Sequence, residues 1–187
     1  MDFEKTKAIL KNKLDRERYE HSLRVEALAQ KLCKIYHADA AKAQSAALLH
    51  DVSRFLDRRG MLEHAKKLNF NISALEAAEP KLLHARLSRY FAEHEFGVTD
   101  PEILDAIEYH TVGRPNMGLL EKIIYVADHA EAGRDHPGID GIQKLAQQSL
   151  DQAIARSTQH TLKYLQENKL PVDQRTIETN RFYSKMS

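Results

Sequence analysis

The sequence predicts an all-α fold in a single domain, residues 1–187. Apolar residues recur every three or four positions, as in Leu28, Leu32 and Ile35, and this is the period of an amphipathic helix. No segment keeps up the alternation of apolar and polar residues that is typical of a strand. A chain of 187 residues is long enough for one well-buried core and short for two. We therefore expect a helical core over residues 17–150, with C-terminal helices of residues 151–187 packed on it.

Residues that start or stop helices divide the chain into about eight expected helices. In Asp100-Pro101-Glu102, a carboxylate stands at the capping position and proline occupies the first helical position. Gly133 and Gly138 enclose an expected loop. The helix breaks are expected, in chain order, at Asn12 and Asp15, at Ala38-Asp39, at Gly60, at Pro80, at Gly97 with Asp100-Pro101, at Gly113 with Pro115, and at Pro171.

Composition and charge exclude several classes of protein. Basic residues number 28 and acidic residues 27, so the formal net charge is +1 and no global field attracts nucleic acid. No apolar run reaches the length of about 18 residues that a membrane-spanning helix needs. The N-terminal segment MDFEKTKAILKNKL lacks the apolar stretch of a secretory signal. The single Cys33 cannot form an internal disulfide, which agrees with a reducing compartment, and we expect a cytoplasmic protein.

Four residues are candidate ligands for one divalent metal ion: His21, His50, Asp51 and Asp128. His50 and Asp51 end the alanine-rich stretch AAKAQSAALLHD, and Asp128 ends the apolar run LLEKIIYVAD, which predicts a central helix. A buried imidazole or carboxylate loses its water and needs a compensating partner, which a divalent cation supplies for all four. Taken alone, His21 is more typical of a core or boundary histidine.

The order His21, His50-Asp51, Asp128 resembles the HD-domain superfamily of metal-dependent phosphohydrolases. Within that superfamily, residues 17–183 resemble the bacterial YqeK-type family of symmetrical bis(5'-nucleosyl)-tetraphosphatases, which cut diadenosine tetraphosphate into two molecules of ADP. The resemblance is carried by residues 110–139, HTVGRPNMGLLEKIIYVADHAEAGRDHPGI, where His110 to Pro115 and Gly133-Arg134-Asp135 flank the candidate metal aspartate at fixed spacing.

The resemblance implies a helical HD bundle with a metal site in a central cleft. It also implies that the divalent ion is iron, although the mixed donor set suits cobalt, nickel, manganese or magnesium as well. His84, His110 and Asp51 are then expected to be catalytic. The expected nucleotide contacts are His21, His84, His110 and Thr111, together with Arg175, Thr176, Ile177 and Asn180 near the C-terminus. The same C-terminal stretch is equally typical of a final amphipathic helix.

His84 and His110 each close or interrupt an apolar helical pattern, so both are expected to face the same cavity as the metal site. Two roles stay open for them. They complete a second metal position, or they donate hydrogen bonds and protons to the phosphate chain, which is the role we favour on sequence grounds. Ordinary histidines at helix ends are the structural alternative.

Basic residues near these motifs matter because a nucleoside polyphosphate carries more negative charge than one divalent ion neutralises. The candidates are Arg54, Arg58, Lys122 and Arg134, although a solvated surface charge is the default for each of them. Arg54 follows the His50-Asp51 pair by about one turn. Arg134 is the strongest candidate because its glycine-flanked loop can also bring backbone N–H groups to an anion.

Two rival functions remain open at this stage. An HD phosphohydrolase acting on another nucleotide, such as a deoxynucleoside triphosphate or a guanosine alarmone, would release inorganic triphosphate or pyrophosphate instead of two nucleoside diphosphates. A sensor that binds metal and nucleotide without turnover would release no product. A helical interaction protein is a third option, but it leaves the buried-type polar residues unexplained. Homodimer formation is left open by the sequence.

Overall fold

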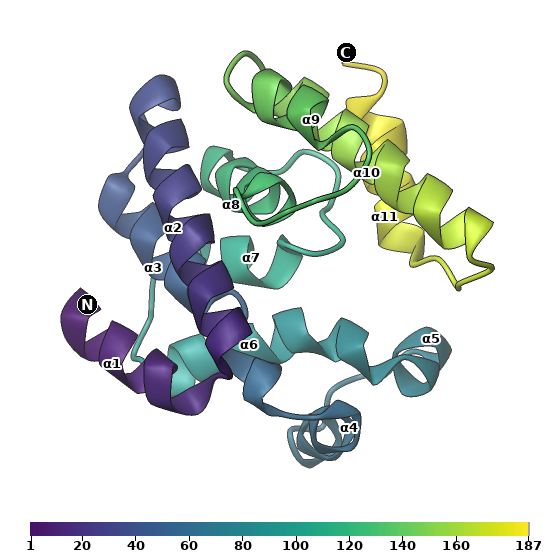
Figure 1. The fold of residues 1–187 in the computed structure, drawn as a ribbon. Helices are drawn as coiled ribbons and strands as arrows, with labels where there is room; N and C mark the ends of the chain where they lie inside the picture. Colours follow the sequence, from purple (N-terminus) through teal and green to yellow (C-terminus); the bar gives the residue numbers. More distant parts are fainter. Residues whose placement is uncertain (187) are drawn as a thin grey trace.

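The computed structural model describes residues 1–186, and within them it contains helices and no strand (Figure 1), so the all-α prediction is confirmed. In the same range, every helix is too short or too polar to cross a membrane. The helices follow in chain order as α1 (Phe3–Lys13), α2 (Arg16–Tyr36), α3 (Ala40–Leu49), the 3₁₀ helix η1 (Val52–Phe55), α4 (Arg58–Lys67), α5 (Ala74–Ala78), the 3₁₀ helix η2 (Pro80–Leu83), α6 (His84–His94), α7 (Pro101–Tyr109), α8 (Leu119–Ala130), α9 (Ile139–Ala146), α10 (Leu150–Glu167) and α11 (Gln174–Tyr183).

Capping side chains fix where most of these helices begin. Asp15 accepts the N–H of Arg18 at the start of α2, and Asp39 caps α3. Asp100 caps α7, with Pro101 at the first helical position, as the sequence predicted. The first N–H groups of a helix have no partner inside it, so a carboxylate that accepts them selects the start residue.

Two details of the expected helix pattern are wrong. Gly60 does not break a helix, because it lies in the first turn of α4, where its N–H donates to the capping carboxylate of Asp57 (2.7 Å). The chain also forms more helices than the roughly eight expected, because polar residues that punctuate less strongly than glycine and proline act as breaks. Asn69, with a left-handed φ of 54°, lies between α4 and α5, and Ser149 caps α10 after the end of α9.

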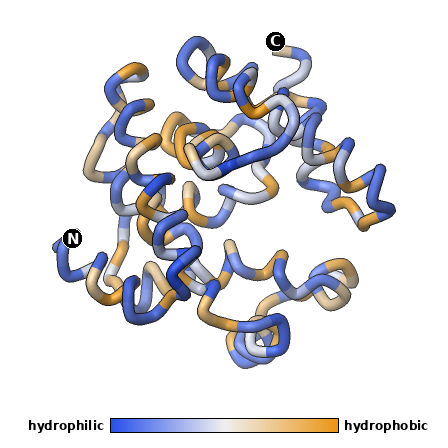
Figure 2. Tube along the Cα trace, viewed as in Figure 1, coloured by the Kyte–Doolittle hydropathy of each residue, from blue (hydrophilic) through white to orange (hydrophobic). Residues whose placement is uncertain are grey.

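Helix α8 lies at the centre of the bundle, as its apolar sequence predicted. It contacts α2, α3 and α7, and also α9 and α10 (Figure 1). Ile123, Ile124 and Val126 of α8 have no exposed surface, and the trace through α8 is mostly coloured as hydrophobic in Figure 2. Burying a side chain of this size contributes about 1.5–3 kcal/mol. The same packing carries Asp128, in the last turn of α8, into the core.

The C-terminal helices hold the loop that follows α7. Helix α10 packs on α8, and α11 packs on α10. From α11, the hydroxyl of Thr179 donates to the carbonyl of Val112 (3.1 Å), and the hydroxyl of Tyr183 accepts the N–H of Met117 (2.8 Å). Helix α11 therefore holds residues 112–117 at both ends of the segment.

We expect Gly113 to be more sensitive to substitution than Gly97, although both have a left-handed φ of +68°. A Cβ at Gly113 would lie 2.7 Å from Cγ2 of Thr179, whereas a Cβ at Gly97 meets open space. Gly97→Ala should lower the free energy of unfolding by about 1–2 kcal/mol through backbone strain. Gly113→Ala should lower it by about 2–5 kcal/mol, since overpacking adds to the strain. Urea denaturation of both variants measures the difference, and equal losses would contradict a role for the contact with Thr179.

Candidate metal centre

Histidines and carboxylates from distant parts of the chain meet in one buried cluster. His21, His50 and Asp51 bring their ligand atoms within 4.8 Å of one another, and so do Asp51, His84 and His110. Asp51 belongs to both groups. Its Oδ2 lies 3.9 Å from Nε2 of His50, and its Oδ1 lies 3.4 Å from Nε2 of His84 and 3.8 Å from Nε2 of His110. One carboxylate thus belongs to two triads of ligand atoms.

Asp128 joins the first triad. Its Oδ1 lies 3.0 Å from Nε2 of His21 and 3.9 Å from Nε2 of His50. The structure therefore brings together all four residues that the sequence singled out as metal ligands. We refer to His21, His50, Asp51, His84, His110 and Asp128 as the cluster; each of its members is at most 8% exposed.

Three cluster histidines are held in the same way at the ends of helices. His50 follows α3, His110 follows α7 and His84 follows η2, and the Nδ1 of each lies against the carbonyl three residues earlier. These distances are 2.7 Å for both His50 and His110. A carbonyl only accepts, so Nδ1 carries the proton and Nε2 of each neutral ring presents a lone pair to the cluster.

Ring nitrogens that face each other at short distance call for a cation. Nε2 of His21 lies 3.2 Å from Nε2 of His50, and Nε2 of His84 lies 3.1 Å from Nε2 of His110. The hydroxyl of Thr111 lies 2.9 Å and 3.0 Å from the second pair, but it has only one proton to donate. Imidazole nitrogens and carboxylates at these separations are the donor set of first-row divalent metals. The cluster therefore fits a divalent metal ion.

The protonation states agree with metal binding, which requires neutral histidines and ionised carboxylates. Burial lowers the pKa of His50 to about 4 and, together with the charge of Arg54, the pKa of His84 to about 3. Burial acts to raise the pKa of Asp51, but His50, His84 and Arg54 outweigh it and hold that pKa below its ordinary value. The same opposition holds at Asp128, where contacts with His21 and Arg134 leave the pKa well lowered.

His21 is the exception among the histidines. Burial acts to lower the pKa of His21, but the hydrogen bond with Asp128 and the charges of Asp128 and Asp51 together outweigh it and raise the pKa above its ordinary value. Metal ligation requires the lone pair of Nε2, so a metal ion competes with a proton at this nitrogen.

Arginines flank the two carboxylates of the cluster. The guanidinium of Arg54 lies 3.3 Å from Oδ1 of Asp51, and that of Arg134 donates to Oδ1 of Asp128 (2.6 Å) and to its backbone carbonyl (2.8 Å). Both were expected from the sequence near the site. Arg18 was not expected; it reaches Oδ2 of Asp51 at 3.3 Å.

Two other basic candidates lie against partners outside the cluster. Lys122 pairs with Asp151 of α10 (2.7 Å) and lies over the ring of Tyr183. Arg58 pairs with Glu79. The structure thus gives both side chains a role in packing between elements.

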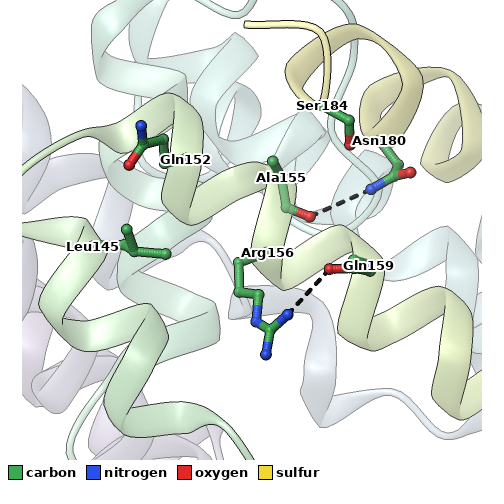
Figure 3. A pocket seen from close by; sticks show the side chains of 7 residues that line it. All are labelled: Leu145, Gln152, Ala155, Arg156, Gln159, Asn180 and Ser184. Atoms are coloured by element: carbon green, nitrogen blue, oxygen red, sulfur yellow. Dashed lines mark hydrogen bonds between the residues drawn. The ribbon is translucent and has the colours of Figure 1, made fainter. Parts of the chain in front are cut away.

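The C-terminal helix α11 lies beside residues 112–117, the loop that follows His110. Arg175, in the first turn of α11, pairs with Asp173 (2.7 Å) and reaches Glu76 at 3.8 Å. Thr176 is buried and Ile177 half-buried. Asn180 donates to the carbonyl of Ala155 and to the hydroxyl of Thr158 (2.9 Å). It also lines a hollow of about 320 Å³ between α9, α10 and α11 (Figure 3), whose lining includes no cluster residue: Leu145, Gln152, Ala155, Arg156, Gln159, Asn180 and Ser184.

Sequence reasoning missed two residues that contact the cluster. Arg18 and Glu131 each stand three positions from a ligand, before His21 and after Asp128, which puts them on the same helical side as that ligand; this spacing is the signal that could have found them.

The sequence and the fold are similar to those of known proteins. The family model described as HD domain matches residues 18–133. The symmetrical bis(5'-nucleosyl)-tetraphosphatase of Bacillus subtilis (strain 168) is 40% identical over 172 residues, which cover 92% of each chain. The enzyme of that name from Staphylococcus aureus (strain NCTC 8325 / PS 47) is 37% identical over 186 residues, covering 98% of this chain and 95% of the relative.

A solved structure shows the same architecture. The crystal structure of a protein from Clostridium acetobutylicum, described as a predicted HD superfamily hydrolase involved in NAD metabolism, matches with a TM-score of 0.95 and 35% identity, over 100% of this chain and 99% of that one. The resemblance seen in the sequence is confirmed, and this chain belongs to the HD-domain family.

Proposed function

We propose that the protein is a metal-dependent hydrolase that cuts diadenosine tetraphosphate and related dinucleoside tetraphosphates symmetrically into two nucleoside diphosphates. The observation that carries the proposal is the buried cluster, in which Asp51 belongs to two triads of ligand atoms. Arginines lie beside the carboxylates of Asp51 and Asp128. Relatives that match nearly the whole chain are named symmetrical bis(5'-nucleosyl)-tetraphosphatases, and this supports the choice of substrate.

His21, His50, Asp51 and Asp128 would hold the divalent ion, which we propose to be iron. When bound, such an ion polarises a phosphoryl oxygen and acidifies water, so that hydrolysis proceeds at neutral pH. Water adds to one of the two central phosphorus atoms, the bridging P–O bond breaks, and the second nucleoside diphosphate leaves with the bonding electron pair.

The arginines beside the cluster would bind the phosphate chain. Arg18, Arg54 and Arg134 are each partly exposed and pair with carboxylates that a metal ion also engages. Guanidinium groups bind phosphate oxygens in bidentate fashion, so these side chains are suited to hold the charge that the metal leaves uncompensated.

His84 and His110 lie at the end of the cluster where we propose a second divalent ion. Since Nδ1 of each ring donates to a carbonyl, the neutral rings only accept at Nε2. This favours ion binding over the hydrogen-bond donation to phosphate that the sequence suggested. Thr111, whose hydroxyl lies beside both Nε2 atoms, would give up this contact when the ion binds.

The first alternative is a phosphohydrolase for deoxynucleoside triphosphates or guanosine alarmones. The second alternative is a protein that binds metal and nucleotide without turnover. The relatives' names favour the tetraphosphatase over both. The proposal includes the cytoplasmic location that the buried, unpaired Cys33 favours.

Product identification tests the substrate. Purified protein, reconstituted separately with iron, cobalt, nickel, manganese or magnesium, is incubated with diadenosine tetraphosphate, and all products are separated by chromatography. Two ADP per substrate are expected. ATP plus AMP would overturn the symmetrical cleavage, and no product with any of the metals would overturn the proposed substrate.

Asp51→Asn should remove metal and turnover together, because both of its carboxylate oxygens face ligand nitrogens. Outer partners of metal ligands already contribute 10–100-fold to affinity or activity, so we expect a loss of at least about 100-fold for a shared ligand. Metal content per chain and ADP release measure it. Asp105→Asn is the control, since Asp105 pairs with Arg89 and Arg114 away from the cluster. Full metal content with full turnover in Asp51→Asn would refute the site.

His110→Ala should lower turnover by at least about 10–100-fold, because it removes a ligand of the proposed second ion and even outer partners of metal ligands contribute that much. The change should spare the fold, as judged by circular dichroism. His64→Ala is the matched control, because the Nδ1 of His64 also lies against a backbone carbonyl, that of Gly60 (2.9 Å), but its ring packs against Phe91. Unaltered kinetics in His110→Ala would show that His110 has only a structural role.

A further inference from the structure

His21 is held differently from the other three histidines of the cluster. His50, His84 and His110 direct Nδ1 to a backbone carbonyl of their own helical segment. Nδ1 of His21 instead lies 3.1 Å from Oε1 of Glu131, a carboxylate at the end of α8. Its orientation therefore depends on a charged side chain from another helix.

Glu131 is itself fixed from several directions. It is 1% exposed. Its Oε2 accepts the guanidinium N–H of Arg24 (2.6 Å) from α2 and the backbone N–H of Gly133. Oε1 faces His21, with the second guanidinium nitrogen of Arg24 at 3.4 Å. A buried carboxylate with this many donors has one available orientation, and that orientation points Oε1 at the ligand histidine.

The contact with Arg24 requires a glycine at position 133. A Cβ on Gly133 would lie 2.5 Å from Nε of Arg24 and 2.8 Å from its Cζ. Those atoms belong to the far end of a flexible side chain, so the clash is relieved when Arg24 swings away, and the backbone stays in place. An alanine at this position would thus open the clamp on Glu131 without a cost to the fold of the loop.

We propose that Glu131, clamped by Arg24 and Gly133, is a positioning residue that orients the imidazole of His21 and strengthens it as a metal ligand. A carboxylate that accepts the second N–H of a ligand histidine fixes its tautomer and makes its other nitrogen a better donor. The proposal rests on the metal site of the proposed function.

The chain contains a matched control carboxylate on the same helix. Glu121, in the first turn of α8, is 5% exposed. It accepts both Nε (2.7 Å) and Nη2 (2.9 Å) of Arg114 and the N–H of Gly118 (2.7 Å). Glu121 and Glu131 thus share an arginine, a glycine N–H and burial, and they differ in the histidine that only Glu131 contacts.

Cobalt titration of the metal-free protein tests the proposal without substrate. Glu131→Gln keeps the size of the side chain and removes its charge. It should weaken cobalt binding by about 10–100-fold and alter the visible spectrum of the bound ion. Glu121→Gln loses an equivalent buried ion pair, but should keep both the wild-type affinity and the wild-type spectrum.

A second pair of variants tests the clamp and covers the case in which Glu131→Gln does not fold. Gly133→Ala and Arg24→Ala should each weaken cobalt binding in the same direction as Glu131→Gln. In the Arg24→Ala background, Gly133→Ala should have no further effect, because the atoms it clashes with are gone.

The outcomes separate the two hypotheses. No cobalt binding by the wild-type protein would contradict the metal site of the proposed function. Binding by the wild type that is unchanged in Glu131→Gln, or in Gly133→Ala and Arg24→Ala, would overturn the role of Glu131. An equal loss in Glu121→Gln and Glu131→Gln would show a general effect of destabilising α8, and would overturn it as well.

Discussion

The burial of the Asp51 carboxylate is the constraint on which the rest of the structure depends. The residue is 2% exposed, and a charge removed from water to this extent has to be compensated by partners inside the protein. Arg18 and Arg54 supply charge, and histidines from three helical segments supply polar contacts. Removing one partner of a buried charge typically costs about 3–5 kcal/mol. The packing of α2, η1, η2 and α7 is therefore coupled to a single charge at their meeting point.

Helix ends are the means by which the fold places its ligands. The last carbonyls of a helix have no partner within it, and an imidazole N–H that follows the helix satisfies one of them while the ring becomes fixed. His50, His84 and His110 all use this arrangement. A chain of hydroxyls maintains the spacing between two of the segments, since Ser53 of η1 donates to the carbonyl of His84 (2.8 Å) and Ser88 of α6 donates to Ser53 (3.0 Å).

The sequence predicted the fold class and the cluster because both leave local patterns. Asp128 stood out as the one charge closing an apolar run, and such a run requires a central helix whose charge needs a partner. The spacing of Arg18 and Glu131 places each on a ligand's side of its helix, but it does not tell which side chain of another helix each one meets. Lys122 shows the same limit: it pairs with Asp151 of α10, and no local pattern could indicate that partner.

The sharing of the cluster among distant segments has a thermodynamic consequence. Its residues come from α2, from the two positions after α3, from the junction of η2 and α6, from the end of α7, and from α8. An unfolded chain therefore cannot assemble the site. An ion that binds only the native state adds RT ln(1 + [L]/Kd) to its stability, about 4.1 kcal/mol at a free concentration of 1,000 Kd. For a protein of ordinary stability, about 5–15 kcal/mol, this is a large share. The supply of metal in the cell would then set how much folded protein persists, as well as how fast each molecule works.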